Sequence, residues 1–387
     1  MLTEAPRPNS ARSAPGIRGV ASRRRRPVEW IVEKAILLVS LSAILMILLI
    51  FVFIGREALP VIFGQTNSAA QQESIPVAQM DSMTDDQLMA YLDMSPDEYR
   101  TMDRETIKLL MEVKVDAANA APDNPDATIN TTRWRYLLRP YEWFGYDKPE
   151  YIWQPVGMIH KYNIMPLLIG SLKVSLIAML FAAPLALGAA IYVSQLASPG
   201  KKEFLKPIIE LLSGIPSVVL GFFALLVMAT VLQRIFGYET RLNAFLAGTA
   251  LSLAVIPMVF SIAEDALTSV PRAYSQAALA LGASRWQAAF QIVLPAALPG
   301  VFAALVLGFG RALGETMIVL MTSAASVMSW SIFDSARPIT ATIAAELLEA
   351  VYGGHHYRVL FLLGTMLFAF TFALNLIGEV IMNRLKG

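Results

Sequence analysis

Between two long apolar segments, residues 276–295 read QAALALGASRWQAAFQIVLP. The stretch begins as a helix with small side chains, among them Ala277 and Ala278, which let another backbone come close. Gly282 can adopt the left-handed conformation that ends a helix, and an amphipathic second helix follows it up to the proline. This pattern predicts an exposed helical knob of the kind that fits a groove on a soluble partner.

The composition indicates that lipid is the solvent for much of the chain. Of its 387 residues, 56% are hydrophobic and 16% are charged, whereas a soluble domain carries about 25% charged residues. The formal net charge of +1 offers no field that would attract nucleic acid. The chain has no cysteine, which excludes disulfides, thiolate metal sites and cysteine nucleophiles. We expect no cofactor.

Six apolar segments are long enough to cross a bilayer, which takes about 20 helical residues. They cover residues 35–54, 164–196, 208–232, 242–263, 298–325 and 359–382. The sequence therefore predicts an all-α membrane protein with six transmembrane helices. We place the first at 34–55 and a five-helix core at 164–387, with the loop between spans four and five at 271–297.

The positions of basic residues predict how the spans are oriented. Residues 1–33 form a basic tail with four consecutive arginines at 23–26, and basic residues next to a span keep that side in the cytoplasm. Further lysines and arginines occur at 201–206, at 272–285 and at the chain's end. We expect both termini to be cytoplasmic and the protein to be a multi-pass membrane protein. Glu264 and Asp265, at the cytoplasmic end of span four, are expected to be solvated.

Residues 56–163 form an acidic insertion between helices 1 and 2, which this topology places in the periplasm. Residues 84–118 are expected to be helical, with Thr84 and Gln87 in the arrangement of a capping box and a second helix start at 95–98. An amphipathic insertion of this kind is either a small packing cap or a docking surface for an external partner. The residues leave both readings open.

Span five carries two charges that hydrocarbon disfavours. Arg311 and Glu315 are four residues apart, which would put them on one face of a helix and allow them to pair. Gly310 and Gly314 form a small-xxx-small step that permits close helix packing. The two charges form either a structural ion pair or an anion relay in which the arginine offers its donors to phosphate oxygens.

The loop at 276–295 resembles the EAA signature of bacterial ABC-importer permeases, including the spacing from Gly282 to Ile292. Gln276 stands where the family usually has glutamate, so a charge is lost at this position. The resemblance implies a type I ABC importer (MetI-like) fold and a loop that inserts into a separate ATP-binding subunit. This chain would then not be an enzyme. The coupling residues that it implies are Gln276, Ala277, Ala278, Gly282 and Ala283.

Three further stretches are similar to Pst-type phosphate permeases, especially the PstC-like subunit. They are GRALGETM at 310–317, ELLSGIPSVVLG at 210–221, and IAAELLEA at 343–350 followed by His356-Tyr357. The resemblance implies phosphate as the cargo, with Arg311 and Glu315 on its path. It also implies a second permease subunit, two ATP-binding ABC subunits and a periplasmic phosphate-binding protein as partners, within membrane lipid.

Two alternatives remain open at this point. The first keeps the transporter class and changes the cargo to another oxyanion, such as sulfate or molybdate. The second is a membrane sensor or scaffold of a phosphate-signalling complex, in which the acidic insertion would be the working part. A proton-coupled carrier is disfavoured, because the spans contain few ionisable groups besides Arg311 and Glu315.

Overall fold

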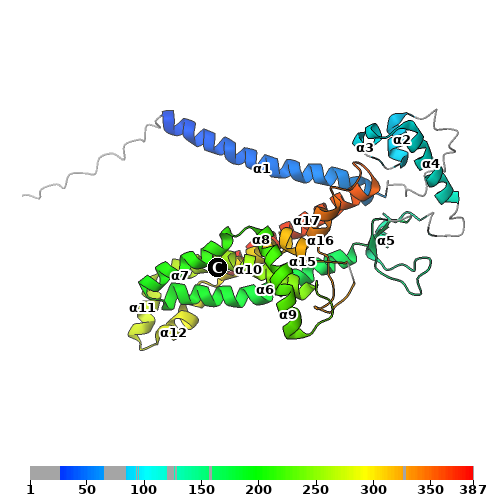
Figure 1. Cartoon of the computed structure of the whole chain (residues 1–387). Helices are drawn as coiled ribbons and strands as arrows, with labels where there is room; N and C mark the ends of the chain where they lie inside the picture. The colour runs from blue at the N-terminus through cyan, green and yellow to red at the C-terminus, as the bar shows by residue number, and fades with distance from the viewer. Residues whose placement is uncertain are drawn as a thin grey trace, which may run out of the picture. The chain divides into compact units, whose positions relative to one another are not determined.

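A computed structural model describes residues 27–64, 84–92, 94, 96–119, 126, 129–156, 159–325 and 328–386 (Figure 1). The arginines at 23–26, on which the predicted orientation depends, lie outside these residues. The chain divides into two compact units, Met1–Val52 and Phe53–Gly387, which are described separately.

The described part of the first unit is a helix with an apolar surface. Helix α1 covers Pro27–Ile62, and its section up to Val52 belongs to this unit. All described side chains from Trp30 to Val52 are exposed, and most of them are apolar. A helix that is apolar on all sides suits the interior of a membrane, where no face needs to be polar.

The second unit contains the other membrane helices. Their elements are α6 (Met165–Ile191), η4 (Tyr192–Leu196), α8 (Ser217–Phe223), η6 (Ala224–Met228), α9 (Ala229–Phe236), α10 (Ala244–Ser269), α14 (Leu298–Gly314) and α17 (His355–Lys386). Among the described residues of the whole chain, five helices, α1 included, are long and apolar enough to span a membrane. The count becomes six if the pair Arg285–Ala296 and Leu298–Gly314, bent by 72°, forms one span.

Helix α10 occupies the centre of this unit, packed between α6 and α14. Small residues make the approach close. A Cβ atom added at Gly248 of α10 would lie 2.5 Å from Ile177 of α6, and one added at Gly308 of α14 would lie 2.4 Å from Val259 of α10. Without a hydrophobic force between helices in lipid, close packing of this kind supplies the association.

Span three begins later than predicted. The sequence favoured a span at 208–232, but the structure has a separate helix α7 (Pro199–Leu211), a short 3₁₀ turn η5 (Leu212–Gly214) and extended backbone at Ile215 before the span starts at Ser217. Pro216 is the N-cap residue of α8, and a proline favours an extended residue before it. The apolar residues before Pro216 therefore belong to a different helix.

The predicted helix at 84–118 is divided into α2 (Asp85–Leu92), α3 (Pro96–Thr101) and α4 (Arg104–Asn119). The backbone N–H of Thr84 donates to Gln87 Oε1 at 2.9 Å, so half of the predicted capping box is present. Leu88, Ile107 and Met111 form a small buried cluster. Asp103 accepts from the Thr106 N–H at 3.2 Å and so caps α4 at the break.

Residues 129–156 and 159–163, called the hairpin segment here, contain α5 (Trp134–Leu138) and the antiparallel strands β1 (Trp153–Gln154) and β2 (Lys161–Tyr162). The segment packs into one apolar cluster with α6, α17 and a short helix α16 (Ile339–Glu346). Leu137, Trp153 and Tyr162 are buried in that cluster. The hairpin segment is therefore part of the helical core's packing.

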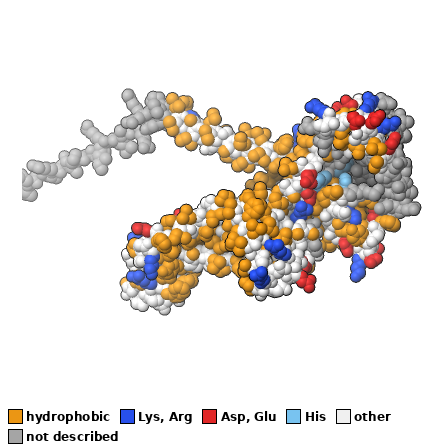
Figure 2. All heavy atoms as spheres, in the orientation of Figure 1, with side chains coloured by type: hydrophobic (Ala, Val, Ile, Leu, Met, Phe, Trp, Pro, Cys, Tyr) orange, Lys and Arg blue, Asp and Glu red, His pale blue; other side chains and the backbone are white. Residues whose placement is uncertain are grey.

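The surface of the membrane helices is largely apolar, whereas charged side chains gather towards the ends of the second unit (Figure 2). Exposed apolar side chains on α6 and α8 include Leu176, Leu180, Phe222 and Phe223. This distribution suits helices surrounded by lipid or by partner helices.

Substitution of Gly248 by alanine tests the α6–α10 packing. The added methyl group would overlap Ile177, and overpacking of this kind costs about 1–3 kcal/mol. We expect Gly248→Ala to lower the midpoint of thermal unfolding in detergent. The matched control is Gly188→Ala on α6, where an added Cβ meets nothing within 4 Å. An equal change in the two variants would contradict the packing argument.

Candidate functional site

The predicted helical knob at residues 276–295 is present at one end of the second unit, where α11 and α12 (Arg285–Gln287) lie (Figure 1). Helix α11 covers Arg272–Ala280, and Gly282 follows it with φ of +90°. The N–H of Gly282 donates to the Leu279 carbonyl, and the N–H of Ala283 donates to the Ala278 carbonyl. These two bonds are those of a Schellman motif, which confirms that a left-handed glycine ends the helix.

A second helix starts directly after this turn. Ser284 Oγ accepts from the Gln287 N–H, and Gln287 Oε1 accepts from the Ser284 N–H, so a complete capping box opens α12 (Arg285–Gln287). The helix continues through the π-helical segment η7 (Ala288–Val293) and α13 (Leu294–Ala296). The turn between the two helices is thereby held on one side by backbone hydrogen bonds and on the other by bonds from backbone N–H groups to side chains.

The knob buries its small residues and exposes large apolar ones. Ala278, Ala288 and Ala289 are buried where α11 packs against η7. Of the predicted coupling residues, Gln276, Ala277 and Gly282 are exposed and Ala283 is half-buried. The exposed fraction of Leu281 is 90% and that of Trp286 is 59%. Large apolar side chains presented to water in this way are typical of a surface that a partner covers.

Beside the knob lies a buried ion cluster that the sequence analysis missed. Glu264 was expected to be solvated, but it is only 1% exposed. Its two carboxylate oxygens accept from Lys202 and Lys206 of α7, each at 2.7 Å, and Thr268 Oγ1 donates to it at 3.0 Å. The prediction was correct only for Asp265, whose side chain is 75% exposed.

The error over Glu264 has a physical cause. Helix α7 folds back along α10 and covers the carboxylate, and the sequence indicated no contact between these two helices. The sequence did contain a signal for this contact. Lys202 and Lys206 are one helical turn apart, and the predicted topology places them on the same side of the membrane as Glu264. The hydrogen bond to Glu264 raises the pKa of Lys206, so the lysine is charged. The cluster, formed by Lys202, Lys206, Glu264 and Thr268, ties α7 to the helix that leads into the knob.

Span five is interrupted between the two charges predicted to pair. Helix α14 ends at Gly314, Glu315 has extended backbone with ψ of 134°, and helix α15 (Met317–Thr322) starts two residues later. Arg311 and Glu315 therefore do not share a helical face, and no ion pair joins them in the described chain. The expectation of an Arg311–Glu315 pair was wrong, because the helix ends between them.

Arg311 lies on the uncovered face of α14. Leu307, Arg311 and Gly314, spaced as one helical face, are all exposed, and Met317 beyond the break is exposed too. The opposite face packs on α6, α10 and α17. Gly310 lies near Asn375 of α17, whereas an added Cβ at Gly314 would meet nothing within 4 Å, so only one glycine of the predicted step is at a helix contact.

Glu315 is half-buried beside α16, the helix that follows the long loop after span five. Thr340 Oγ1 of α16 donates to the Glu315 carbonyl at 2.7 Å. A cavity of about 340 Å³ lies at this contact, lined by Thr316, Thr340, Ile343, Ala344, Leu347 and Leu348. Breaks in membrane helices leave backbone groups available, and transporter substrate sites are often built at them.

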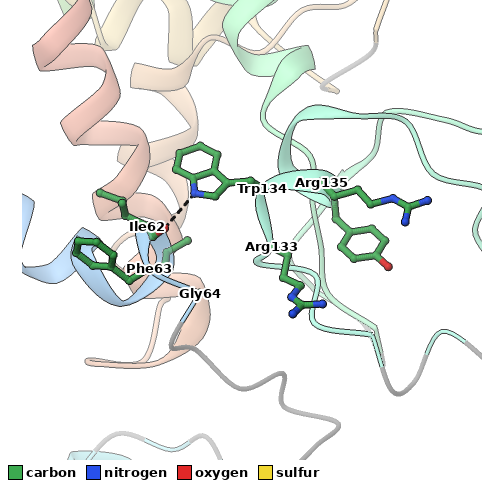
Figure 3. Close-up of a pocket in the computed structure, with 8 residues that line it drawn as sticks. Ile62, Phe63, Gly64, Arg133, Trp134 and Arg135 are labelled. Carbon is green, nitrogen blue, oxygen red and sulfur yellow. Dashed lines mark hydrogen bonds between the residues drawn. The ribbon is translucent and has the colours of Figure 1, made fainter.

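A second pocket, of about 470 Å³, lies between the end of α1 and α5 (Figure 3). Trp134 points towards α1 and donates from Nε1 to the Ile62 carbonyl at 3.0 Å. Arg133 and Arg135 also line this pocket, but the predicted site residues do not. Among the described residues, no group of three histidine, aspartate or glutamate side chains is arranged to hold a metal ion.

A protein-family model covers residues 182–386, which is more than half of the chain. It describes the binding-protein-dependent transport system inner membrane component. This chain belongs to that family. The matched region contains the knob, the ion cluster, the break in span five and α16, so membership and geometry concern the same residues. The all-α membrane fold predicted from the sequence is confirmed, and the protein is the permease subunit of an ABC importer.

Two relatives found by sequence agree with the family assignment. The chain is 36% identical over 236 residues to the probable ABC transporter permease protein YqgH of Bacillus subtilis, covering 60% of this chain and 76% of that protein. It is 33% identical over 255 residues to the phosphate transport system permease protein PstC of Xylella fastidiosa, covering 60% and 77%. Among solved structures, an inward-facing MetNI methionine ABC transporter is similar at 19% identity, with a TM-score of 0.44, over 57% of this chain and 94% of that one.

Replacement of Glu264 tests the ion cluster. Glu264→Gln removes the charge that compensates two lysines. Because the lysines are 35% and 31% exposed, the loss should cost less than that of a fully buried pair, roughly 1–3 kcal/mol. We expect a lower midpoint of thermal unfolding in detergent. Asp265→Asn, at the adjacent and mostly exposed carboxylate, is the matched control and should change the midpoint little. A Glu264→Gln variant as stable as the control would show that the buried carboxylate contributes nothing.

Proposed function

We propose that this permease carries inorganic phosphate across the inner membrane, driven by ATP hydrolysis in separate subunits. The observation that carries the proposal is Arg311, an arginine exposed on the uncovered face of a membrane helix, next to the break in span five. Exposure of a guanidinium to lipid would be energetically costly. A charged side chain at this position is therefore better explained by a pathway for an anion. Its planar set of donors matches phosphate oxygens.

The break at Glu315 and Thr316 separates Arg311 from the partner first expected. Glu315 does not hold the arginine through a helical pair. Its carbonyl instead fixes α16 through Thr340, beside the cavity lined by Thr316. We infer that the anion passes between Arg311 and this cavity, with Glu315 as a pathway residue through its place at the break. The likeness to PstC proteins supports phosphate among the oxyanions.

The knob is the contact that we propose for an ATP-binding ABC subunit. Leu281 and Trp286 protrude from a turn held by a Schellman motif and a capping box, so they form a rigid apolar projection. Gln276 and Ala277 are exposed next to it, and Gln276 would contact the ATPase through hydrogen bonds. A rigid projection transmits displacement, because it moves with the helices on both sides of it.

The remaining partners follow from the same proposal. A second permease subunit would cover the exposed faces of α8 and α14, and a phosphate-binding protein would deliver the anion on the periplasmic side. The knob would then be cytoplasmic, as would both chain termini, and the residues between α1 and α6 would be periplasmic. This assignment agrees with the lysines at 201–206 and the arginines at 272 and 285, which lie at the knob's end of the unit.

Replacement of Arg311 tests the pathway. A charge-assisted hydrogen bond contributes enough that its loss should lower phosphate uptake at least about tenfold. We expect Arg311→Gln to show this loss in proteoliposomes of the complete transporter while the complex still assembles. Arg234→Gln, at an exposed arginine of α9, is the control and should transport normally. Normal uptake by Arg311→Gln would exclude the relay.

The same assay identifies the cargo. Unlabelled phosphate should compete with labelled phosphate, whereas sulfate and molybdate at equal concentration should not. Competition by sulfate or molybdate equal to that by phosphate would replace phosphate with the broader class of oxyanions.

Replacement of Gly282 tests the knob. Valine disfavours positive φ, and a left-handed residue of that kind costs about 1–2 kcal/mol, so the turn should rearrange. We expect Gly282→Val to lower the amount of ATP-binding subunit that co-purifies with the permease at least about fivefold. The matched control is Gly200→Val on α7, where φ is not positive and an added Cβ meets nothing within 4 Å. Unchanged stoichiometry in Gly282→Val would count against the knob as the contact.

A further inference from the structure

Helix α16, which forms one wall of the cavity beside Thr316, is attached at three points. At its start, the N–H of Ile339 donates to Ser171 Oγ of α6 at 2.8 Å. One residue on, Thr340 holds the Glu315 carbonyl at the break in span five. At its end, Glu346 is buried in a group of polar side chains from other parts of the chain. These three polar contacts add to the apolar packing of α16 against its neighbouring helices.

The contact at Glu346 connects α16 to the hairpin segment. Trp153 of β1 donates from Nε1 to both carboxylate oxygens of Glu346, at 3.1 and 3.2 Å. Arg337 donates to one of these oxygens at 3.0 Å, and His356 Nε2 of α17 lies 3.4 Å from the other. Trp153 and Glu346 are 7% and 8% exposed, respectively, so water can replace these bonds only poorly.

Trp153 gives this group a direct hydrogen bond to the hairpin segment. Arg337 precedes α16 on the same stretch of chain. Its backbone packs closely on α6, because a Cβ added at Gly170 would lie 3.0 Å from the Arg337 carbonyl oxygen. His356, in the first turn of α17, stacks on Tyr162 of β2, with ring centroids 5.8 Å apart and an angle of 10°. The stacked rings of His356 and Tyr162 can slide over each other, because stacking has little directional preference. The hydrogen bond from Trp153 to the Glu346 carboxylate is directional and therefore also orients α16.

We propose that Trp153 and Glu346 are positioning residues, through which the hairpin segment sets the position of α16 and so the access to the cavity beside Thr316. The proposal rests on the proposed function only for what passes through that cavity. A buried carboxylate with its donors has a strongly preferred arrangement, because an unpaired member would be costly in this apolar cluster. When the hairpin segment moves, α16 must move with it or lose these bonds.

The absence of cysteine from the chain makes a direct test possible. Ala344→Cys places a single thiol on α16 in the lining of the cavity, at a half-buried position. Its rate of reaction with a water-soluble methanethiosulfonate reports access to the cavity without any need for transport. The measurement is made on the complete transporter in proteoliposomes, in parallel with phosphate uptake.

Trp153→Phe keeps an aromatic ring and removes the donor. We expect the thiol's reaction rate to change by about tenfold, the effect of losing one hydrogen bond to a charged group. The matched control is Trp143→Phe, since Trp143 is also buried in the hairpin segment but packs on Tyr136 and Tyr141. In that control the rate should stay as in the parent. Combining Trp153→Phe with Glu346→Gln should have no greater effect than Glu346→Gln alone, because both act through one contact.

Two results would overturn the positioning role. One is an unchanged reaction rate in a folded Trp153→Phe variant. The other is an equal change in both tryptophan variants, which would indicate general loosening of the hairpin segment. The proposed function has a separate readout. If the parent transporter, before any thiol labelling, imports no phosphate, the cargo assignment fails. The difference in thiol reaction rate between the two tryptophan variants would still decide the role of Trp153.

Discussion

The fit of α10 between α6 and α14 is the interaction on which the rest of the second unit depends. Gly248 brings α6 against α10 and Gly308 brings α14 against α10, at separations that leave no room for a methyl group. Hydrocarbon offers little driving force for helices to associate, so contact has to come from the fit of their surfaces. With these three helices fixed, α17 packs on α14 and α15 on α8. The bundle thus provides the rigid frame that a moving element requires.

The polar features of the unit occur where this frame is interrupted or ends. Helical backbone satisfies its own hydrogen bonds in lipid, and an irregular stretch has to find other partners. At the break after Gly314, the Glu315 carbonyl finds Thr340 of α16. At the end of α10, Glu264 finds two lysines of α7. Lys173 of α6 donates to the carbonyls of Ser329 and Ser331, which fixes the loop that leads to α16.

These contacts give an ordered connection between the two ends of the permease. At one end, the knob and the ion cluster tie α11 and α7 to α10. At the other, Trp153 and Glu346 tie the hairpin segment to α16. The break beside Arg311 connects these two groups of contacts. Helix α15, which follows the break, packs on α10 as well as on α8 and α16. A permease whose two ends move together during transport requires connections of this kind.

The sequence alone determined the class of this protein, because membrane helices and a helix–glycine–helix knob are local features. Length and hydropathy decide a span, and Gly282 with Ser284 and Gln287 decides the turn through bonds between near neighbours. The contacts between distant segments depended on tertiary structure. Burial of Glu264, the separation of Arg311 from Glu315 and the bond from Trp153 to Glu346 each depend on which helix comes to lie beside another. The hydrophobic periodicity of a segment does not predict such contacts. It indicates which face of a helix is apolar, but not which other segment packs against that face.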